Sequence, residues 1–259
     1  MKKLLFIWFF LLAPTLFALY NGNPSAPALI EEGFFFSKEN YLSVKAGYQR
    51  DWDFDRDMKA VSKFSGRMNE FSYIADQGVL TFNFINRIEL YGSAGAARFT
   101  VAHIPLPGVR NEYETHNQFA WGVGLRGIIY SWGNLSLGAD FKYGRAQPTL
   151  RWMTTNGVPV QPRPGSKLNF HEWQFGAGAS YEVGIFFPYL AVRYSNATSR
   201  IKHLPTGFLP QTRHFNMKNR RKFGLALGCS LSNFNRFSAT VEARLIDEQA
   251  LTLAGEVKF

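Results

Sequence analysis

Cysteine is nearly absent from this chain of 259 residues: Cys229 is the only one, so no intrachain disulfide can form. Long apolar runs are also scarce. After the first eighteen residues, no stretch approaches the roughly 20 apolar residues that a membrane-spanning helix needs. A mean hydropathy of −0.16 likewise excludes a multi-helix membrane protein. Charged residues make up 19% of the chain and hydrophobic residues 46%, with a net charge of +10, a composition that excludes an acidic disordered chain.

The first eighteen residues have the pattern of a secretory signal peptide. Lys2 and Lys3 form a positively charged region, and an apolar stretch follows from Leu4 to Leu12. Pro14 interrupts this stretch before it is long enough to cross a membrane, and Ala18 is the small residue expected before a cleavage site. The pattern predicts an exported protein that begins at residue 19 after cleavage.

Beyond the signal, apolar and polar residues alternate with the period of two that is typical of half-buried β-strands. In the last segment, one face carries Leu251, Leu253, Gly255, Val257 and Phe259, and the other carries Thr252, Ala254, Glu256 and Lys258. Such stripes run for about ten residues, the length that a tilted strand needs to cross a bilayer, whereas soluble strands average five or six. This length favours a membrane barrel over a soluble sandwich, although a sandwich alternates too.

The connections between these segments alternate in length. Those at 131–134 and 233–236 are short, whereas those at 51–66, 102–117, 148–169 and 202–218 are long and polar. Outer-membrane barrels show this asymmetry, because their periplasmic turns are tight and their extracellular loops are long. The asymmetry therefore also favours a barrel in the outer membrane.

We predict an all-β fold, a transmembrane antiparallel β-barrel of about ten strands. The predicted strands are 41–50, 68–84, 88–101, 118–131, 135–147, 170–184, 188–200, 220–232, 236–246 and 249–259. Asp76, Gln77 and Gly78 interrupt the second strand as a bulge or an extra turn, so a count of eight or twelve stays open. The chain then divides into a signal peptide at 1–18, an N-terminal periplasmic or lumenal segment at 19–40 and a barrel at 41–259.

The alternation also predicts which charged side chains point into the barrel. They are Lys45, Glu89, Arg126, Asp140, Lys142, Glu172, Glu182, Arg193, Lys222, Glu242, Arg244, Glu256 and Lys258. These groups either line a path for small solutes and ions or pair with one another and plug the lumen. In the first case, seven basic groups against six acidic ones predict a slight preference for anions.

Glycines share this inward face, and they allow two interpretations. The inward glycines are Gly47, Gly122, Gly124, Gly138, Gly144, Gly176, Gly178, Gly224 and Gly228. They either leave a narrow passage or let the strands curve.

No motif predicts a catalytic, metal or cofactor site. The stretch Gly122–Gly127 fits G-x-G-x-x-G, but it lies inside a predicted strand with no helix behind it. No two of the five histidines are spaced as i and i+4, which argues against a helical metal site. The acidic run from Asp51 to Asp57 leaves a rim protease as a minor alternative, although nothing local pairs it with a histidine. The basic stretch 200–222 is interpreted as a solvated face, with contact to an anionic lipid headgroup or glycan as a lesser alternative. Export argues against a nucleic-acid partner.

Several segments, in order along the chain, resemble the chlamydial major outer membrane porin family. They are LYNGNPSAPALIEEGFF from Leu19, YLSVKAGYQRDWDFDRDM from Tyr41, TFNFINRIEL from Thr81, FAWGVGLRGIIYSWGNLSLGADFKYGRAQP from Phe119, FHEWQFGAGASYEVGIFFPYLAVRYSNA from Phe170 and ATVEARLIDEQALTLAGEVKF from Ala239. The resemblance implies an outer-membrane porin that passes small solutes and ions by passive diffusion, contributes to envelope structure and assembles as a homotrimer.

The chain departs from that family in two ways. Familiar members are longer and rich in cysteine, whereas this chain has only Cys229 and about ten predicted strands. A disulfide-linked coat is therefore not expected. Because barrel diameter grows with strand number, ten strands leave little room for a channel. A non-conducting structural or adhesin-like barrel therefore stays open as the alternative function.

The last residue, Phe259, ends an apolar stripe at the point where the barrel must close. It resembles the assembly signal of bacterial outer-membrane proteins, which implies the barrel-assembly machinery and the lipid of the outer membrane as partners.

Overall fold

The structure is a computed structural model that describes residues 22–37, 39–61, 66–205 and 214–259. The predicted signal peptide and its cleavage site at residues 18 and 19 lie outside the described residues. No helix within the described ranges is long and apolar enough to cross a membrane.

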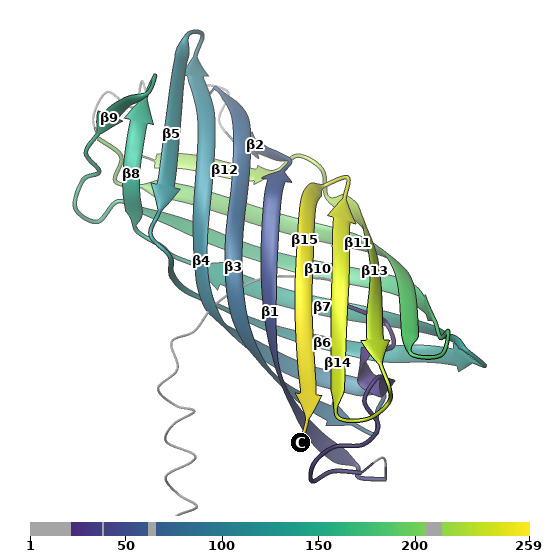
Figure 1. Ribbon diagram of the computed structural model, residues 1–259. Coiled ribbons are helices and arrows are strands. Elements are labelled where there is room, and N and C mark those ends of the chain that lie inside the picture. The colour runs from purple at the N-terminus through teal and green to yellow at the C-terminus, as the bar shows by residue number, and fades with distance from the viewer. Residues whose placement is uncertain (1–21, 38, 62–65, 206–213) are drawn as a thin grey trace, which may run out of the picture.

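Ten long antiparallel strands form one closed barrel, which confirms the predicted fold and strand number (Figure 1). In ring order they are β1 (Leu42–Arg56), β3 (Arg67–Phe84), β4 (Ile88–Leu106), β6 (Gln118–Trp132), β7 (Leu135–Ala146), β10 (Lys167–Tyr181), β11 (Phe186–Lys202), β13 (Phe223–Ser232), β14 (Phe237–Leu245) and β15 (Glu248–Lys258). The last strand pairs with the first, with Ala46 opposite Val257. Closure leaves no open edge, as a sheet in lipid requires.

Strand β3 does not have the bulge or turn expected at residues 76–78. Gln77 lies opposite Gln49 of β1 and Gly95 of β4 in unbroken register, and the only shift from β4 lies between Met68 and Glu70. The polar residues interrupt the sequence pattern but not the strand. Asp76 lies on the outer face, where it pairs with Arg50 at 3.4 Å.

The long connections gather at one end of the barrel and the short turns at the other, as predicted. Shorter strands extend the first end: β2 (Met58–Ala60), β5 (Val109–Thr115), β8 (Leu150–Thr155), β9 (Val158–Val160) and β12 (His214–Asn219). The segments expected to be loops are therefore partly sheet, and β1 continues to Arg56 rather than ending at residue 50. One connection at this end is short, because β14 and β15 are joined through Ile246 and Asp247 alone. The end with the tight turns is assigned to the periplasm.

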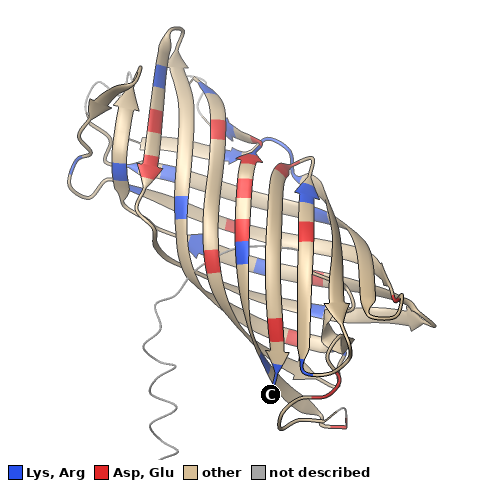
Figure 2. Ribbon diagram, viewed as in Figure 1, with Lys and Arg blue, Asp and Glu red and all other residues tan. Residues whose placement is uncertain are grey.

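An apolar outer surface encircles the barrel between two levels of aromatic side chains. Tyr130, Trp132 and Tyr181 are exposed near the periplasmic turns. At the opposite level, the rings of Trp173 and Tyr194 lie 5.3 Å apart. From Tyr181 to Trp173 the tilted strand rises about 20 Å along the membrane normal, which nearly matches the apolar band of outer-membrane barrels. Acidic and basic residues are interspersed along β1 and other strands (Figure 2), and most of those in the wall point inward.

Candidate functional site

The interior of the barrel is the candidate site, and most of the predicted charged residues lie there. Those that point inward are Lys45, Glu89, Arg126, Asp140, Lys142, Glu172, Arg193, Glu242, Arg244, Glu256 and Lys258. Except for Glu256, which is slightly exposed, all of them are buried. Neighbouring residues on the same strands face lipid, because successive side chains of a strand alternate between faces.

Glu182 and Lys222 do not share this interior, so their assignment to it was wrong. Glu182 lies just after the end of β10, in the turn toward β11. Lys222 precedes β13 and is exposed, and its Nζ donates to Oη of Tyr194 on the outer face at 3.2 Å. In both cases the alternation was extended past the residue where the strand ends.

Two groups of ion pairs cross the middle of the lumen. In the group closer to the periplasm, Glu89 accepts from two strands: Nζ of Lys45 lies 2.6 Å from its Oε1, and Nε of Arg126 donates to its Oε2. Nη2 of Arg126 also donates to Oε1 of Glu256 at 2.8 Å. Buried charges persist in proteins only when they are paired and hydrogen-bonded in this way.

The second group is centred on Glu248 and lies closer to the long loops. Nη2 of Arg193 lies 2.8 Å from Oε1 of Glu248 and 2.7 Å from Oδ2 of Asp247. Nη2 of Arg244 donates to Oδ1 of Asp51 at 2.6 Å. These pairs join β11, β14 and β15 to β1 across the interior.

Five of the buried charged residues were missed by the sequence analysis: Asp51, Asp53, Arg56, Asp247 and Glu248. Asp51 and Asp53 have the same parity as Lys45, and Glu248 has the same parity as Glu256. The alternation could therefore have revealed these three residues if the acidic run had not been interpreted as a loop and if the last strand had been started at residue 248.

The missed residues change the charge balance of the interior. Within the described residues, it holds seven basic groups and nine acidic ones. The expected preference for anions therefore loses its basis.

The described part of the N-terminal segment lies against inward side chains at the end of the barrel with the tight turns. It contains a single 3-10 turn, η1 (Ala26–Ala28), and its backbone carbonyls accept from side chains of the wall. Nζ of Lys45 donates to the carbonyl of Ala26 at 2.9 Å, and Nδ2 of Asn83 donates to that of Pro27 at 2.7 Å. Nζ of Lys258 donates to the carbonyl of Glu31 at 2.7 Å. The segment is thus tied to strands β1, β3 and β15 around the ring.

An apolar cluster fills the end of the lumen beneath the long loops. The rings of Phe71, Phe99 and Phe170 lie 5.3 to 5.9 Å from one another, centroid to centroid. Leu168 and Phe215 are fully buried in the same cluster. The inward face is therefore polar in the middle of the barrel and apolar at this end.

At several inward glycines, atoms of other segments occupy the space that a side chain would take. A Cβ at Gly124 would fall on the ring of Tyr91, and a Cβ at Gly228 would fall on the ring of Tyr189. At Gly138 it would meet the backbone of Pro24 from the N-terminal segment. An interior cavity beside Pro24 has a volume of only about 10 Å³, close to the space of a single water. Glycine at these positions makes room for neighbouring side chains and for the N-terminal segment.

The motifs weighed in the sequence lie apart from one another in the described part of the chain. Among them, no group of three or more His, Cys, Asp or Glu side chains is arranged to hold a metal ion. The acidic run does not form one cluster, since Asp51 and Asp53 are buried inside the barrel while Asp57 pairs with Arg220 and Arg221. The glycine-rich stretch 122–127 lies within strand β6.

Comparisons with known proteins agree with the resemblance in the sequence. The family described as Chlamydia major outer membrane protein matches residues 211–259. A major outer membrane porin of Chlamydia pneumoniae is 24% identical over 367 aligned positions, which cover 93% of this chain and 94% of the relative. The major outer membrane porin, serovar F, of Chlamydia trachomatis is 23% identical, with 95% and 96% covered.

Each alignment is longer than this chain, so the relatives carry many residues without a counterpart here. Among solved structures, the translocator domain of the autotransporter NalP from Neisseria meningitidis has a TM-score of 0.47 and 13% identity, with 91% of each chain covered. The similarity to the chlamydial major outer membrane porins thus extends over almost the whole chain, and the protein is a porin-like β-barrel of the outer membrane.

Proposed function

We propose that the protein is a narrow porin that is closed in the conformation described. Small ions and solutes diffuse passively through it only during brief openings, and its continuous contribution is to envelope structure. The observation that carries this proposal is the packed interior, where the N-terminal segment, the ion pairs and the apolar cluster follow one another along the barrel axis.

The proposed path follows the sixteen charged residues of the interior, which include the eleven identified from the sequence. Ions would move along these groups when the ion pairs exchange partners, because a charged group can release one partner only when another replaces it in a dry interior. With seven basic and nine acidic groups in the interior, we expect a weak preference for cations during openings. No step in this proposal requires a catalytic group or a cofactor, and we propose that the protein is not an enzyme.

A non-conducting structural or adhesin-like barrel is the second candidate. The deep burial of the charged side chains in the middle of the lumen favours it. Arg193, Arg244 and Glu248 are each at most 1% exposed at the side chain, so water does not reach the middle of the lumen in this conformation. The two candidates differ in whether this packing ever opens.

Planar-bilayer recordings on the refolded full-length chain test the proposal. A narrow porin gives rare, small current steps, with a reversal potential slightly to the cation side in a salt gradient. Steady, large conductance contradicts a closed interior. Complete absence of steps in independent preparations favours the non-conducting barrel.

We also propose that the barrel assembles as a homotrimer through the outer face of β1, β3 and β4. This face carries the small residues Ala46, Gly78 and Ala94, together with the ion pair between Arg50 and Asp76. A charged pair on a lipid-facing wall is costly, and contact with a second copy would shield it. Replacement of Arg50 and Asp76 by Leu and Asn should lower the yield of cross-linked trimer while the barrel still folds, and an unchanged yield would exclude this face.

For biogenesis, we propose that Phe259 presents the C-terminal strand to the barrel-assembly machinery. Its backbone N–H donates to the carbonyl of Val44 at 3.0 Å, so it lies at the junction of the first and last strands.

A further inference from the structure

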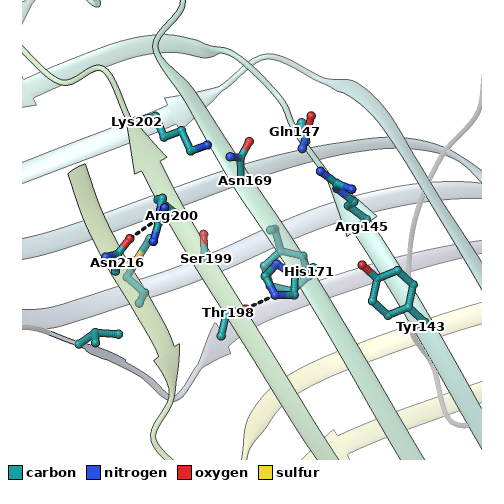
Figure 3. Close-up of a pocket in the computed structure, with 13 residues that line it drawn as sticks. Tyr143, Arg145, Gln147, Asn169, His171, Thr198, Ser199, Arg200, Lys202 and Asn216 are labelled. Carbon is teal, nitrogen blue, oxygen red and sulfur yellow. Dashed lines mark hydrogen bonds between the residues drawn. The ribbon is translucent and has the colours of Figure 1, made fainter. Parts of the chain in front are cut away.

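A polar groove lies on the outer face of the barrel, close to the end that carries the long loops (Figure 3). Its volume is about 650 Å³, and strands β7, β10, β11 and β12 contribute its walls. The side chains that matter here are Arg145, Asn169, His171, Arg200, Lys202 and Asn216. All six sit at outward positions of their strands and face the surroundings of the barrel, whereas the floor of the groove includes Phe170, Ser199 and Met217 from inward positions.

The groove is positively charged. Arg145, Arg200 and Lys202 come from two strands and approach Asn169 from opposite sides (Figure 3). No acidic residue is among the described residues that line the groove, and none of these three cations has an ion-pair partner in the described part of the chain. Most other basic side chains of the barrel wall are paired, as Arg50 is with Asp76 and Arg98 is with Glu114. An unbalanced set of cations is thus concentrated at one place.

Hydrogen bonds within the groove hold its side chains in place. Nε of Arg200 donates to Oδ1 of Asn216 at 2.6 Å, and His171 Nε2 lies 2.6 Å from Oγ1 of Thr198. The bond through Nε fixes the guanidinium of Arg200 and leaves its two terminal nitrogens to meet a ligand. Arginine binds phosphate oxygens well in this geometry, since its parallel N–H groups match two oxygens of one anion.

Along the membrane normal, the groove lies at the level of the lipid headgroups. Asn169 and His171 follow Trp173 on the outer face of β10, and Trp173 belongs to the aromatic level that marks the upper limit of the apolar surface. Four residues along a tilted strand raise Asn169 about 10 Å above Trp173. Below the groove, the exposed side chains of Phe141 and Phe175 lie four residues from Arg145 and His171, and Leu190 lies further down β11; they offer an apolar surface to acyl chains.

We propose that this groove binds the phosphate of a lipid headgroup in the outer leaflet of the outer membrane. The phosphate would lie between Arg145, Arg200 and Lys202, and Asn169 and His171 would donate to its remaining oxygens. The acyl chains would run down over the apolar surface beneath. A lipid is favoured over a dissolved anion, because the charged groove opens directly onto that apolar surface.

Native mass spectrometry of the refolded full-length barrel in detergent tests this proposal with lipid A that carries two phosphates, and with the same lipid after phosphate removal. We expect binding of the phosphorylated lipid and at least tenfold weaker binding of the phosphate-free lipid. The double variant Arg145→Gln/Arg200→Gln should also bind the phosphorylated lipid at least tenfold more weakly, as expected from about 1 kcal/mol for each basic residue at an anionic surface.

Arg98→Gln is the control, because Arg98 also faces outward on strand β4 but does not line the groove. The Arg98→Gln variant should bind the phosphorylated lipid with an affinity within twofold of that of the unaltered chain. Heat-modifiable gel mobility reports folding, and Lys202→Gln gives a second test if the double variant does not fold.

Three results would overturn the proposal. They are equal binding of the phosphate-free lipid, an equal loss in Arg98→Gln, and complete displacement of the lipid by inorganic phosphate at millimolar concentration. The last result would identify a site for a dissolved anion.

Discussion

Arg244 holds the most connected position in the interior, and its replacement by methionine should destabilise the barrel strongly. Its guanidinium donates to Glu248, to Thr252 and to Asp51, and it lies 3.5 Å from Glu242. Arg244→Met keeps much of the apolar stem but leaves the buried carboxylates of Asp51 and Glu242 without this cation. Breaking a buried pair by removing one partner costs about 3–5 kcal/mol. We therefore expect the free energy of unfolding to fall by about that amount.

The measurement is urea unfolding of the refolded barrel in lipid vesicles, followed by tryptophan fluorescence. Arg98→Met serves as the matched control, because Arg98 is 44% exposed at the side chain and its contact with Glu114 is long, at 3.8 Å. An exposed pair of this kind contributes about 0–1 kcal/mol. Combining Arg244→Met with Asp51→Asn should recover part of the loss, because the second change removes an unpaired charge. A loss below about 1 kcal/mol in Arg244→Met would show that water reaches this network, and the packed interior would be wrong.

The remaining predictions concern the lipid face, the packing of glycine against tyrosine and the C-terminus. Leu227→Arg, at the middle of β13 on the outer face, should cost about 2–4 kcal/mol in the same unfolding assay, whereas Leu231→Arg near the periplasmic turns should cost about 1 kcal/mol or less; equal losses would contradict the assigned depth. Gly228→Ala should cost about 1–3 kcal/mol, because the new methyl group meets the ring of Tyr189, and Tyr189→Ala in the same chain should reduce this loss. Strict additivity in that double-mutant cycle would argue against the contact. Deletion of Phe259 should lower the membrane-inserted fraction in heat-modifiable gels without changing synthesis, since Phe259 joins the last strand to Val44; an unchanged inserted fraction would remove it from assembly.

The strands could be predicted from short stretches of sequence, because the lipid around the barrel restricts which residues each strand can carry on its outer face. A residue that faces lipid must be apolar, so the alternation could be read from short stretches such as 249–259, and all ten predicted ranges match observed strands to within a few residues at most ends. The same reasoning identified eleven inward charged residues, because side-chain direction depends only on parity along a strand.

The contents of the lumen were harder to predict, because they depend on contacts between distant segments. Asp51 looks like a loop residue locally, and it is stable in β1 because Arg244 of β14 pairs with it across the interior at 2.6 Å. The apolar cluster around Phe170 likewise joins side chains from strands far apart in the sequence. Whether the inward glycines leave a passage could not be decided from the sequence, since their space is filled by Tyr91, Tyr189 and Pro24 from other segments.

Thiol labelling of a single cysteine in the middle of the lumen tests the closed interior most directly. The position is Ser93, which is inward-facing and 8% exposed, in a chain whose native cysteine is replaced by Cys229→Ala. Asn233→Cys in the exposed turn between β13 and β14 serves as the accessible control. With a small water-soluble thiol reagent, the packed interior predicts that Ser93→Cys in the folded barrel reacts at least a hundredfold more slowly than Asn233→Cys, and that the two rates converge after unfolding. Similar rates in the folded barrel would mean that water fills the lumen, and they would contradict the account.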